Sequence, residues 1–199
     1  MLTIFLKESL TYDGTQLGSA FFDAYGNRQD DMAIAFIGPA DVPTENLVDE
    51  DDRRAGRVIK SDRMLHFLIW LPGRSLETGV AIQRLFIATI LEVLRFFGVN
   101  LDGTPMLGGS GSLIREGDDI FRVDKAGRRK LSVSIATTNG DASLIHIGLN
   151  VVTTGAPLPV AGLADLVINE REFAAEALRR FADETSEIIR AKNKVRMVG

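Results

Sequence analysis

The chain has 199 residues, of which 45% are hydrophobic and 25% charged, and its formal net charge at pH 7 is −4. This composition is typical of a globular protein, and the negative charge disfavours broad binding of nucleic acid through bulk electrostatics. The chain contains no cysteine, which excludes disulfide bonds, thiolate metal sites and cysteine nucleophiles.

The first third of the chain alternates between apolar segments and polar turns. Residues 1–7 have the β-branched and aromatic content of a strand, and residues 15–24 are predicted to form a short helix. The apolar runs 32–37 and 64–71 predict strands in the middle of a sheet. Between these runs, residues 41–57 are first acidic and then basic, and we interpret them as a surface loop.

A long helix is predicted from Ser75, which can cap its start, to Gly98, where the apolar spacing of three and four residues ends. The next stretch, residues 101–112, contains four glycines and a proline and is predicted to be irregular. Its segment 108–112 can either cradle a phosphate through backbone amides or form a flexible lid, since it lacks the lysine of a P-loop.

Two strands, residues 130–138 and 143–152, are predicted to pair as a hairpin, because Asn139-Gly140 is a strong turn signal. Residues 170–191 carry apolar positions along one face and predict a final helix. Strands on both sides of a long helix indicate an α+β fold in one domain, residues 1–199. We expect a mixed, largely antiparallel central sheet covered by helices.

The start of the chain lacks the features of a signal peptide, and no apolar run reaches the roughly 20 residues that span a bilayer. We therefore expect a cytoplasmic protein without a membrane partner.

Lys130 is the first candidate for chemistry, because it opens an apolar strand. Its ammonium group can reach a carboxylate or phosphate while its stem is buried, and the alternative is a solvated charge at a strand end. The sequence Lys130-Leu131-Ser132-Val133-Ser134 resembles the strand of biotin and lipoate protein ligases whose lysine contacts the activated acyl group. The order of elements in residues 64–152, including an acidic turn at Asp118-Asp119, is also similar to that of the ligases.

This resemblance implies the biotin/lipoate protein ligase-like fold, of the class II aminoacyl-tRNA synthetase and biotin synthetase type. It also implies activation of a small carboxylic acid with ATP and Mg²⁺. Lys130 would neutralise the acyl or phosphate charge as a catalytic residue, and Asp119 would hold the turn or a magnesium ion. The ligand-binding candidates that the resemblance adds are Arg53, Arg54, Arg57, Arg115, Asp118, Gly148, Ser132 and Ser134. Of these, the three arginines at 53–57 would replace the glycine- and arginine-rich nucleotide loop of the ligases.

Five short segments extend the resemblance to almost the whole chain. They are residues 12–17 (YDGTQL), 64–67 (MLHF), 115–119 (REGDD), 144–148 (LIHIG) and 194–196 (KVR). Together they are similar to an uncharacterised prokaryotic family, the domain of unknown function DUF366, which shares the ligase-type fold. This second resemblance implies a fold and no reaction.

His66 and His146 are the only histidines, and each lies in an apolar strand. In a ligase-like sheet these strands run close together, so the two imidazoles can face each other or a common pocket. The alternatives are two core histidines hydrogen-bonded to neighbours, a pair that shuttles a proton, or ligands of a metal together with Asp118 or Asp119. No spacing enforces a ligand geometry, so we predict no metal site.

Three hypotheses follow for the function. The first is a ligase-like enzyme that binds a nucleotide and a small carboxylic acid. The second is a non-catalytic small-molecule-binding protein that has kept the pocket without the nucleotide loop. The third is a structural homodimer formed by edge strands of the sheet.

Overall fold

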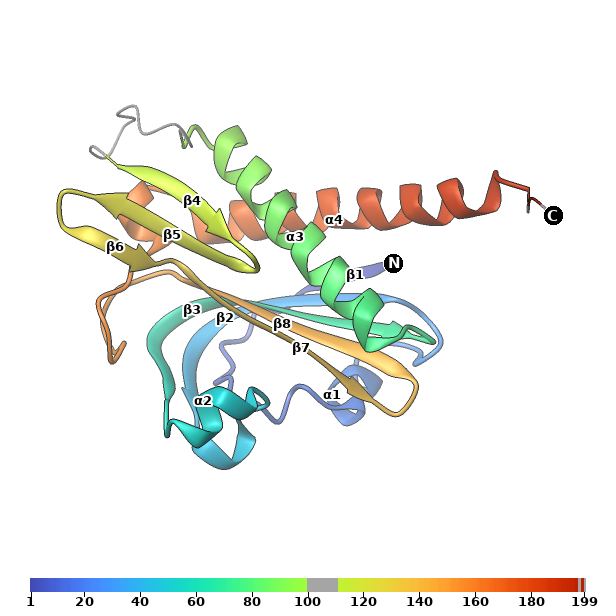
Figure 1. Ribbon diagram of the computed structural model, residues 1–199, viewed down its shortest axis with the longest axis horizontal. Coiled ribbons are helices and arrows are strands. Elements are labelled where there is room, and N and C mark those ends of the chain that lie inside the picture. Colours follow the sequence, from blue (N-terminus) through green and yellow to red (C-terminus); the bar gives the residue numbers. More distant parts are fainter. Residues whose placement is uncertain (100–110, 197, 199) are drawn as a thin grey trace.

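The computed structural model of the chain describes residues 1–99, 111–196 and 198. The glycine-rich stretch 101–112 therefore lies almost entirely outside the described residues. A large mixed sheet forms the centre of the molecule, and two long helices cover one of its faces (Figure 1). The opposite face carries two short helices and the segments that connect them, and this second face holds the candidate site.

The large sheet has five strands in the order β1-β2-β3-β8-β7. Their bounds are β1 Leu2–Phe5, β2 Met32–Val42, β3 Ile59–Pro72, β8 Ala142–Asn150 and β7 Ser132–Asn139. Only β1 and β2 are parallel, and every other neighbouring pair is antiparallel. The expectation of an α+β fold with a mixed, largely antiparallel sheet is confirmed.

A second sheet of three strands lies beside the large one (Figure 1). It contains β4 Ser112–Glu116, β5 Asp119–Asp124 and β6 Gly127–Lys130, paired antiparallel in that order. An acidic turn was predicted here from the sequence, but neither of the strands β4 and β5 was.

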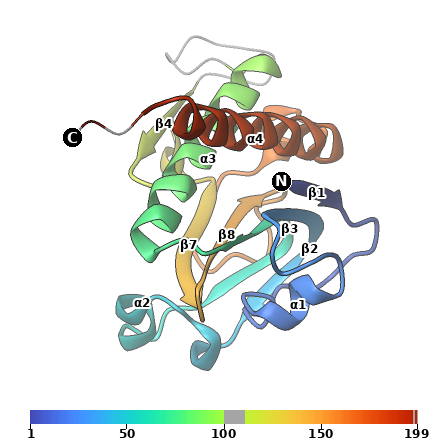
Figure 2. The same ribbon diagram turned by 90° about the vertical axis from the view of Figure 1, so that its right-hand side faces the viewer.

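Helices α3 (Leu76–Phe96) and α4 (Glu170–Asn193) pack on the same face of the large sheet (Figure 2). The predicted cap of α3 is present, because the hydroxyl of Ser75 accepts a hydrogen bond from the amide of Thr78 at 3.2 Å. On the other face lie α1 (Ser19–Asp23) and α2 (Glu50–Arg54). Two short 3₁₀ turns, Thr44–Asn46 and Leu163–Leu166, complete the described elements.

Side chains of β3 alternate between two hydrophobic cores. Leu65, Phe67 and Ile69 face α3 and α4, where the rings of Phe86 and Phe181 stack at 4.1 Å. Leu68 and Trp70 face the opposite side and pack with residues around α1. Burial on both faces explains why the central strands read as unbroken apolar runs. Among the described helices, none is long and apolar enough to cross a membrane.

The prediction of one strand over residues 130–138 is wrong. Strand β6 ends at Lys130 and β7 begins at Ser132, so the chain passes from the small sheet to the large one at the buried residue Leu131. The amide of Leu131 donates to the carbonyl of Ile120, and its carbonyl accepts from the amide of Asn150. Lys130 consequently stands where the two sheets meet, rather than at the open end of a single strand.

Two further elements differ from the predictions. The strand predicted over residues 32–37 extends to Val42, because pairing with β3 continues after a shift in the register between Gly38 and Ala40. The segment 41–57, predicted to be a loop, contains α2, whose first amides are capped by the carboxylate of Asp49.

Candidate functional site

Two adjoining pockets form a groove on the face of the sheet that α3 and α4 leave uncovered. The narrow pocket has a volume of about 90 Å³ and reaches down to Tyr12 and His146. The wide pocket has a volume of about 550 Å³ and extends to the segment 156–160. Both are lined by the same four residues where they adjoin, namely Asp52, Ile59, Lys130 and Val133.

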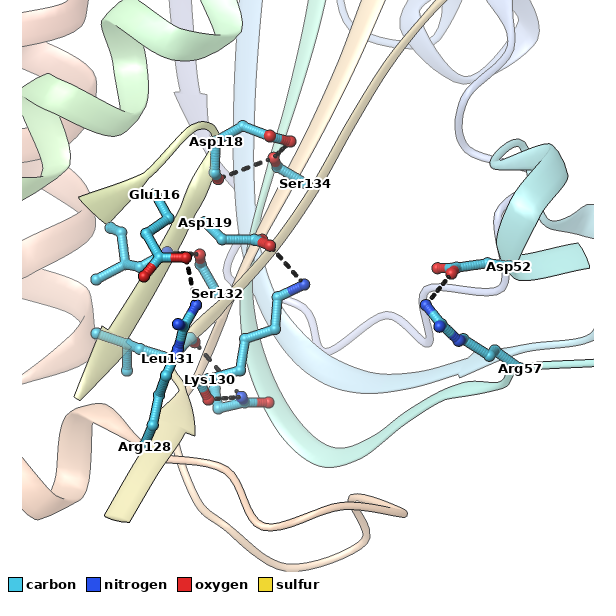
Figure 3. Close-up of polar contacts among 12 residues, drawn as sticks. Asp52, Arg57, Glu116, Asp118, Asp119, Arg128, Lys130, Leu131, Ser132 and Ser134 are labelled. Atoms are coloured by element: carbon cyan, nitrogen blue, oxygen red, sulfur yellow. Dashed lines mark hydrogen bonds and ion pairs between the residues drawn. The ribbon is translucent and has the colours of Figure 1, made fainter. Parts of the chain in front are cut away.

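Lys130 is one of these four shared residues. As the last residue of β6, it is fixed by backbone pairing with Phe121 and by its carbonyl, which accepts from the amide of Ala161 at 3.0 Å. Its Nζ atom lies 2.9 Å from Oδ2 of Asp119, the first residue of β5 (Figure 3). The lysine side chain is 39% exposed and that of Asp119 is 27% exposed, so the pair is in contact with solvent.

The environment of Asp119 acts on its carboxyl group in two directions. Burial raises its pKa above the usual value, while the ammonium group of Lys130 opposes that rise by hydrogen bonding and by charge attraction. The net pKa is raised, so Asp119 takes up a proton more readily than an ordinary aspartate. The structure therefore brings together the two residues predicted to be catalytic.

Asp118 points away from Lys130 and towards Ser134 of β7 (Figure 3). Its Oδ2 atom accepts hydrogen bonds from the hydroxyl of Ser134 at 2.7 Å and from the side-chain amide of Gln83 at 2.9 Å. The hydroxyl of Ser132 accepts from the amide of Ile120 at 2.8 Å. These contacts fasten the β4–β5 hairpin to β7 and α3. Asp118, a ligand-binding candidate from the sequence, therefore makes structural contacts and lines neither pocket.

The four arginines predicted to bind a nucleotide lie in different places. Arg53 and Arg54 pair with acidic residues of α2 itself, are 51% and 73% exposed, and line neither pocket. Arg115 donates to the carbonyl of Gly117 and also lines neither pocket. Only Arg57 borders the wide pocket, where its guanidinium lies 2.6 Å from Oδ1 of Asp52, apart from Lys130 (Figure 3). Of the three arginines at 53–57 that were predicted to replace the nucleotide loop of the ligases, one therefore borders a pocket.

Two cations of the wide pocket were not predicted, namely Lys60 and Arg128. The guanidinium of Arg128 lies 3.7 Å from the ring centroid of Phe121 and 2.6 Å from Oε2 of Glu116. A sequence signal existed for Arg128, because it precedes Lys130 by two residues and side chains two apart in a strand share a face.

His66 and His146 face each other in the interior of the sheet. Nδ1 of His66 lies 3.0 Å from Nε2 of His146, and Nε2 of His66 lies 3.3 Å from the carbonyl oxygen of Gly38. The ring of Tyr12 stacks on His146 with a centroid distance of 3.8 Å. Burial lowers the pKa of His66 to about 3 and that of His146 well below its usual value. Both imidazoles are therefore neutral near pH 7.

Gly148 faces the same side of the sheet as the histidines, but it is covered. A β-carbon at this position would lie 2.3 Å from the sulfur of Met64 and 3.1 Å from Cγ2 of Val133. These side chains cover Gly148, which the resemblance to the ligases had made a ligand-binding candidate. In the part of the chain that the structure describes, no group of three or more histidine, aspartate or glutamate residues is arranged to hold a metal ion.

Comparison with other proteins shows similarity over the whole chain. The family described as "Domain of unknown function (DUF366)" matches residues 1–196. An uncharacterized protein of Methanocaldococcus jannaschii is 31% identical over 176 residues, which are 85% of this chain and 72% of that protein. The solved structure of a protein of unknown function from Pyrococcus horikoshi has a TM-score of 0.85 and 30% identity, with 100% and 99% of the two chains covered.

Ligases share the fold at lower identity. The biotin protein ligase from Aquifex aeolicus, in complex with biotin and ATP, has a TM-score of 0.58 and 16% identity over 92% of this chain and 69% of the ligase. A bi-partite lipoate protein ligase from Thermoplasma acidophilum has a TM-score of 0.53 and 13% identity over 94% and 84%. Such identities show the fold alone, and they confirm the predicted ligase-like fold.

Proposed function

The chain belongs to the DUF366 family and has the fold of the biotin and lipoate protein ligases, and on this basis we propose that it binds a small carboxylic acid and a nucleotide for adenylate-type activation of the acid. One observation carries the proposal: the side chain of Lys130 borders the narrow and the wide pocket where they adjoin.

The reaction requires two ligands to meet at one point. A carboxylate oxygen of the acid bonds to the α-phosphorus of ATP, the bond from that phosphorus to the β-phosphate oxygen breaks, and pyrophosphate leaves. Negative charge from both reactants gathers where they join, and an ammonium group at that point lowers the cost of bringing them together. Lys130 holds its ammonium group at this junction, beside Asp119.

The narrow pocket suits the tail of an acid. Its walls include the apolar side chains of Leu47, Ile59 and Ile135, which can bury methylene groups. A carboxylate that leaves this pocket towards the wide one passes Lys130.

The wide pocket suits a nucleotide. Its volume of about 550 Å³ lies within the usual range for small-molecule sites, roughly 300 to 1,000 Å³. Arg57, Lys60 and Arg128 add three positive charges to that of Lys130, and such groups bind phosphate oxygens through charge-assisted hydrogen bonds. Magnesium would be held largely by the phosphates, as is usual for Mg²⁺, with Asp52 or Asp119 as a carboxylate ligand.

A non-catalytic binding protein is the second candidate, and the positions of Arg53 and Arg54 favour it. Both arginines point out of the groove and pair with acidic residues of α2, so the groove lacks the cluster of arginines that would orient a nucleotide for reaction. Ligand binding without acid activation would be the result.

The test combines binding and exchange. In a thermal-shift assay, MgATP at a hundred times its dissociation constant stabilises the protein by about 2.7 kcal/mol. Lys130→Met should remove most of this shift, while Lys125→Met should retain it, because Lys125 is exposed and lines neither pocket. Acid-dependent exchange of labelled pyrophosphate into ATP would support activation, and nucleotide binding without exchange would support the second candidate. Absence of any shift with nucleotides and acids would refute both.

A further inference from the structure

The inner wall of the narrow pocket is polar, although its side walls are apolar. Tyr12 and His146 form this wall, with their rings stacked at an interplanar angle of 19°. Among the described residues, neither the hydroxyl of Tyr12 nor Nδ1 of His146 has a hydrogen-bond partner. Neither of these two atoms is completely shielded from solvent. Both atoms therefore open onto the pocket, where a bound molecule can pair with them.

The hydrogen bonds of His66 determine whether Nδ1 of His146 is a donor or an acceptor. The carbonyl of Gly38 can only accept, so Nε2 of His66 carries a hydrogen. Nδ1 of the neutral His66 must then accept from Nε2 of His146. A neutral His146 that carries its hydrogen on Nε2 has a bare Nδ1, which is an acceptor.

Tyr12 supplies the complementary group. Burial raises the pKa of its phenol above the usual value, so the hydroxyl stays protonated and can donate. The wall thus offers one acceptor and one donor, and neither carries a charge.

We infer that this wall recognises a small, neutral, hydrogen-bonding group at the far end of the bound acid. A hydroxyl or a primary amide fits, because either can donate to His146 and accept from Tyr12. A hydrocarbon end would leave both protein groups unpaired, and a charged end would lose its hydration without meeting an opposite charge. The inference rests on the proposed function and names the class of acid that this site takes.

The size of the narrow pocket further restricts the class of acid that can bind. Its volume of about 90 Å³ is smaller than that of an engineered cavity of roughly 150 Å³ that accepts benzene. A volume of this size suits an unbranched chain of a few atoms. We therefore take the acid to be short and unbranched.

The test uses acids matched in length, with MgATP present throughout. Hydroxy acids that carry the hydroxyl on the terminal carbon, and acids that end in a primary amide, are compared with unbranched alkanoic acids of three to six carbons by titration calorimetry. The wild-type protein should bind the polar-ended acid of the best length roughly tenfold to a hundredfold more tightly than the alkanoic acid. Equal affinity for the two would overturn the inference.

Tyr12→Phe keeps the stacked ring and removes only the hydroxyl. It should lower affinity for the polar-ended acid about tenfold and leave the affinity for the alkanoic acid unchanged. Tyr25→Phe is the matched control, because Tyr25 is the other tyrosine of the chain and lines neither pocket. An unchanged preference in Tyr12→Phe would count against the donor role.

A measurement on the wild-type protein needs no variant. Binding of the polar-ended acid should shift the ¹⁵N resonance of the bare nitrogen of His146, and the alkanoic acid should leave it in place. Failure of this inference differs from failure of the proposed function. Acid binding that depends on Lys130 but ignores the terminal group would remove the inference alone. Absence of binding by any acid would remove both.

Discussion

Nδ1 of His66 lies 3.0 Å from Nε2 of His146, and this contact links β3 to β8 beneath the ring of Tyr12. Both imidazoles are buried, and burial lowers the pKa of His66 to about 3 and that of His146 well below the usual value. Because both imidazoles are neutral in the folded protein, its stability depends on pH. The same pair also contacts the narrow pocket, since Tyr12 stacks on His146 and lines that pocket.

Stability should fall as the pH falls below about 6.5. In the unfolded chain each histidine takes up a proton near its usual pKa of roughly 6.5, whereas in the folded protein His66 remains neutral down to about pH 3. The unfolded state therefore binds more protons in this window, and at pH 5 each histidine lowers the free energy of unfolding by about 2 kcal/mol relative to pH 8. Urea denaturation at a series of pH values measures the slope.

The double variant His66→Gln/His146→Gln is the control for this slope, because carboxylates such as Asp119 titrate equally in both proteins. Between pH 8 and pH 5, the free energy of unfolding of the wild-type protein should fall by roughly 4 kcal/mol more than that of the double variant. The chain contains two histidines, so imidazole NMR signals of the untagged protein are easily assigned. A signal that titrates near pH 6.5 in the folded protein would contradict the neutral pair.

Local signals in the sequence predicted much of the fold. The apolar runs in β2 and β3, the cap at Ser75 and the Asn139-Gly140 turn depend on neighbouring residues, and all are present. The change of sheet at Leu131 depends instead on hydrogen bonds to residues distant in sequence, Ile120 and Asn150. Because the sequence on both sides of Leu131 shows no local turn signal, it predicts one strand where the structure has two.

Gly38→Ala should destabilise the protein by about 3 kcal/mol, at the upper end of the usual cost of overpacking. A β-carbon at this position would lie 1.9 Å from the carbonyl oxygen of Leu10, which is backbone and cannot rotate away. The segment that contains Leu10 continues to Tyr12, whose amide donates to the carbonyl of Pro39 at 2.9 Å. Displacement of this segment should therefore weaken acid binding as well.

Gly73→Ala separates steric conflict from backbone strain. Gly73 has a φ angle of +64°, and no atom lies within 4 Å of a β-carbon built there, so its cost should be about 1 kcal/mol. Denaturant unfolding of both variants gives the comparison. Equal losses for the two variants would show that Leu10 moves aside freely.

Asp118→Asn should lower the free energy of unfolding by about 1 to 2 kcal/mol without affecting nucleotide binding. The carboxylate of Asp118 accepts from Ser134 and Gln83, and hydrogen bonds to a charged group contribute more than neutral ones. Asp141→Asn, in the exposed turn after β7, should change stability by less than about 0.5 kcal/mol. A loss of the MgATP thermal shift in Asp118→Asn, with stability intact, would restore the nucleotide role predicted from the sequence.

The site was harder to predict than the fold, because it depends on the direction of side chains. Resemblance to ligases singled out Lys130 and Asp119, and the structure pairs them. The directions of the Arg53 and Arg54 side chains are set by α2, a helix that was predicted to be a loop. Of the three arginines that are clustered in the sequence, only Arg57 therefore borders the groove.

Arg57→Gln should reduce the MgATP-dependent thermal shift, whereas Arg54→Gln should leave it unchanged. Both residues are exposed arginines paired with an aspartate, but Arg57 lines the wide pocket and Arg54 does not. Loss of one phosphate contact from a charged donor should weaken nucleotide binding roughly tenfold. Calorimetric titration with ATP measures the affinity, and the free energies of unfolding of the two unliganded variants should agree within about 0.5 kcal/mol, since exposed ion pairs contribute little. Equal ATP affinity in Arg57→Gln and Arg54→Gln would place the nucleotide outside the wide pocket.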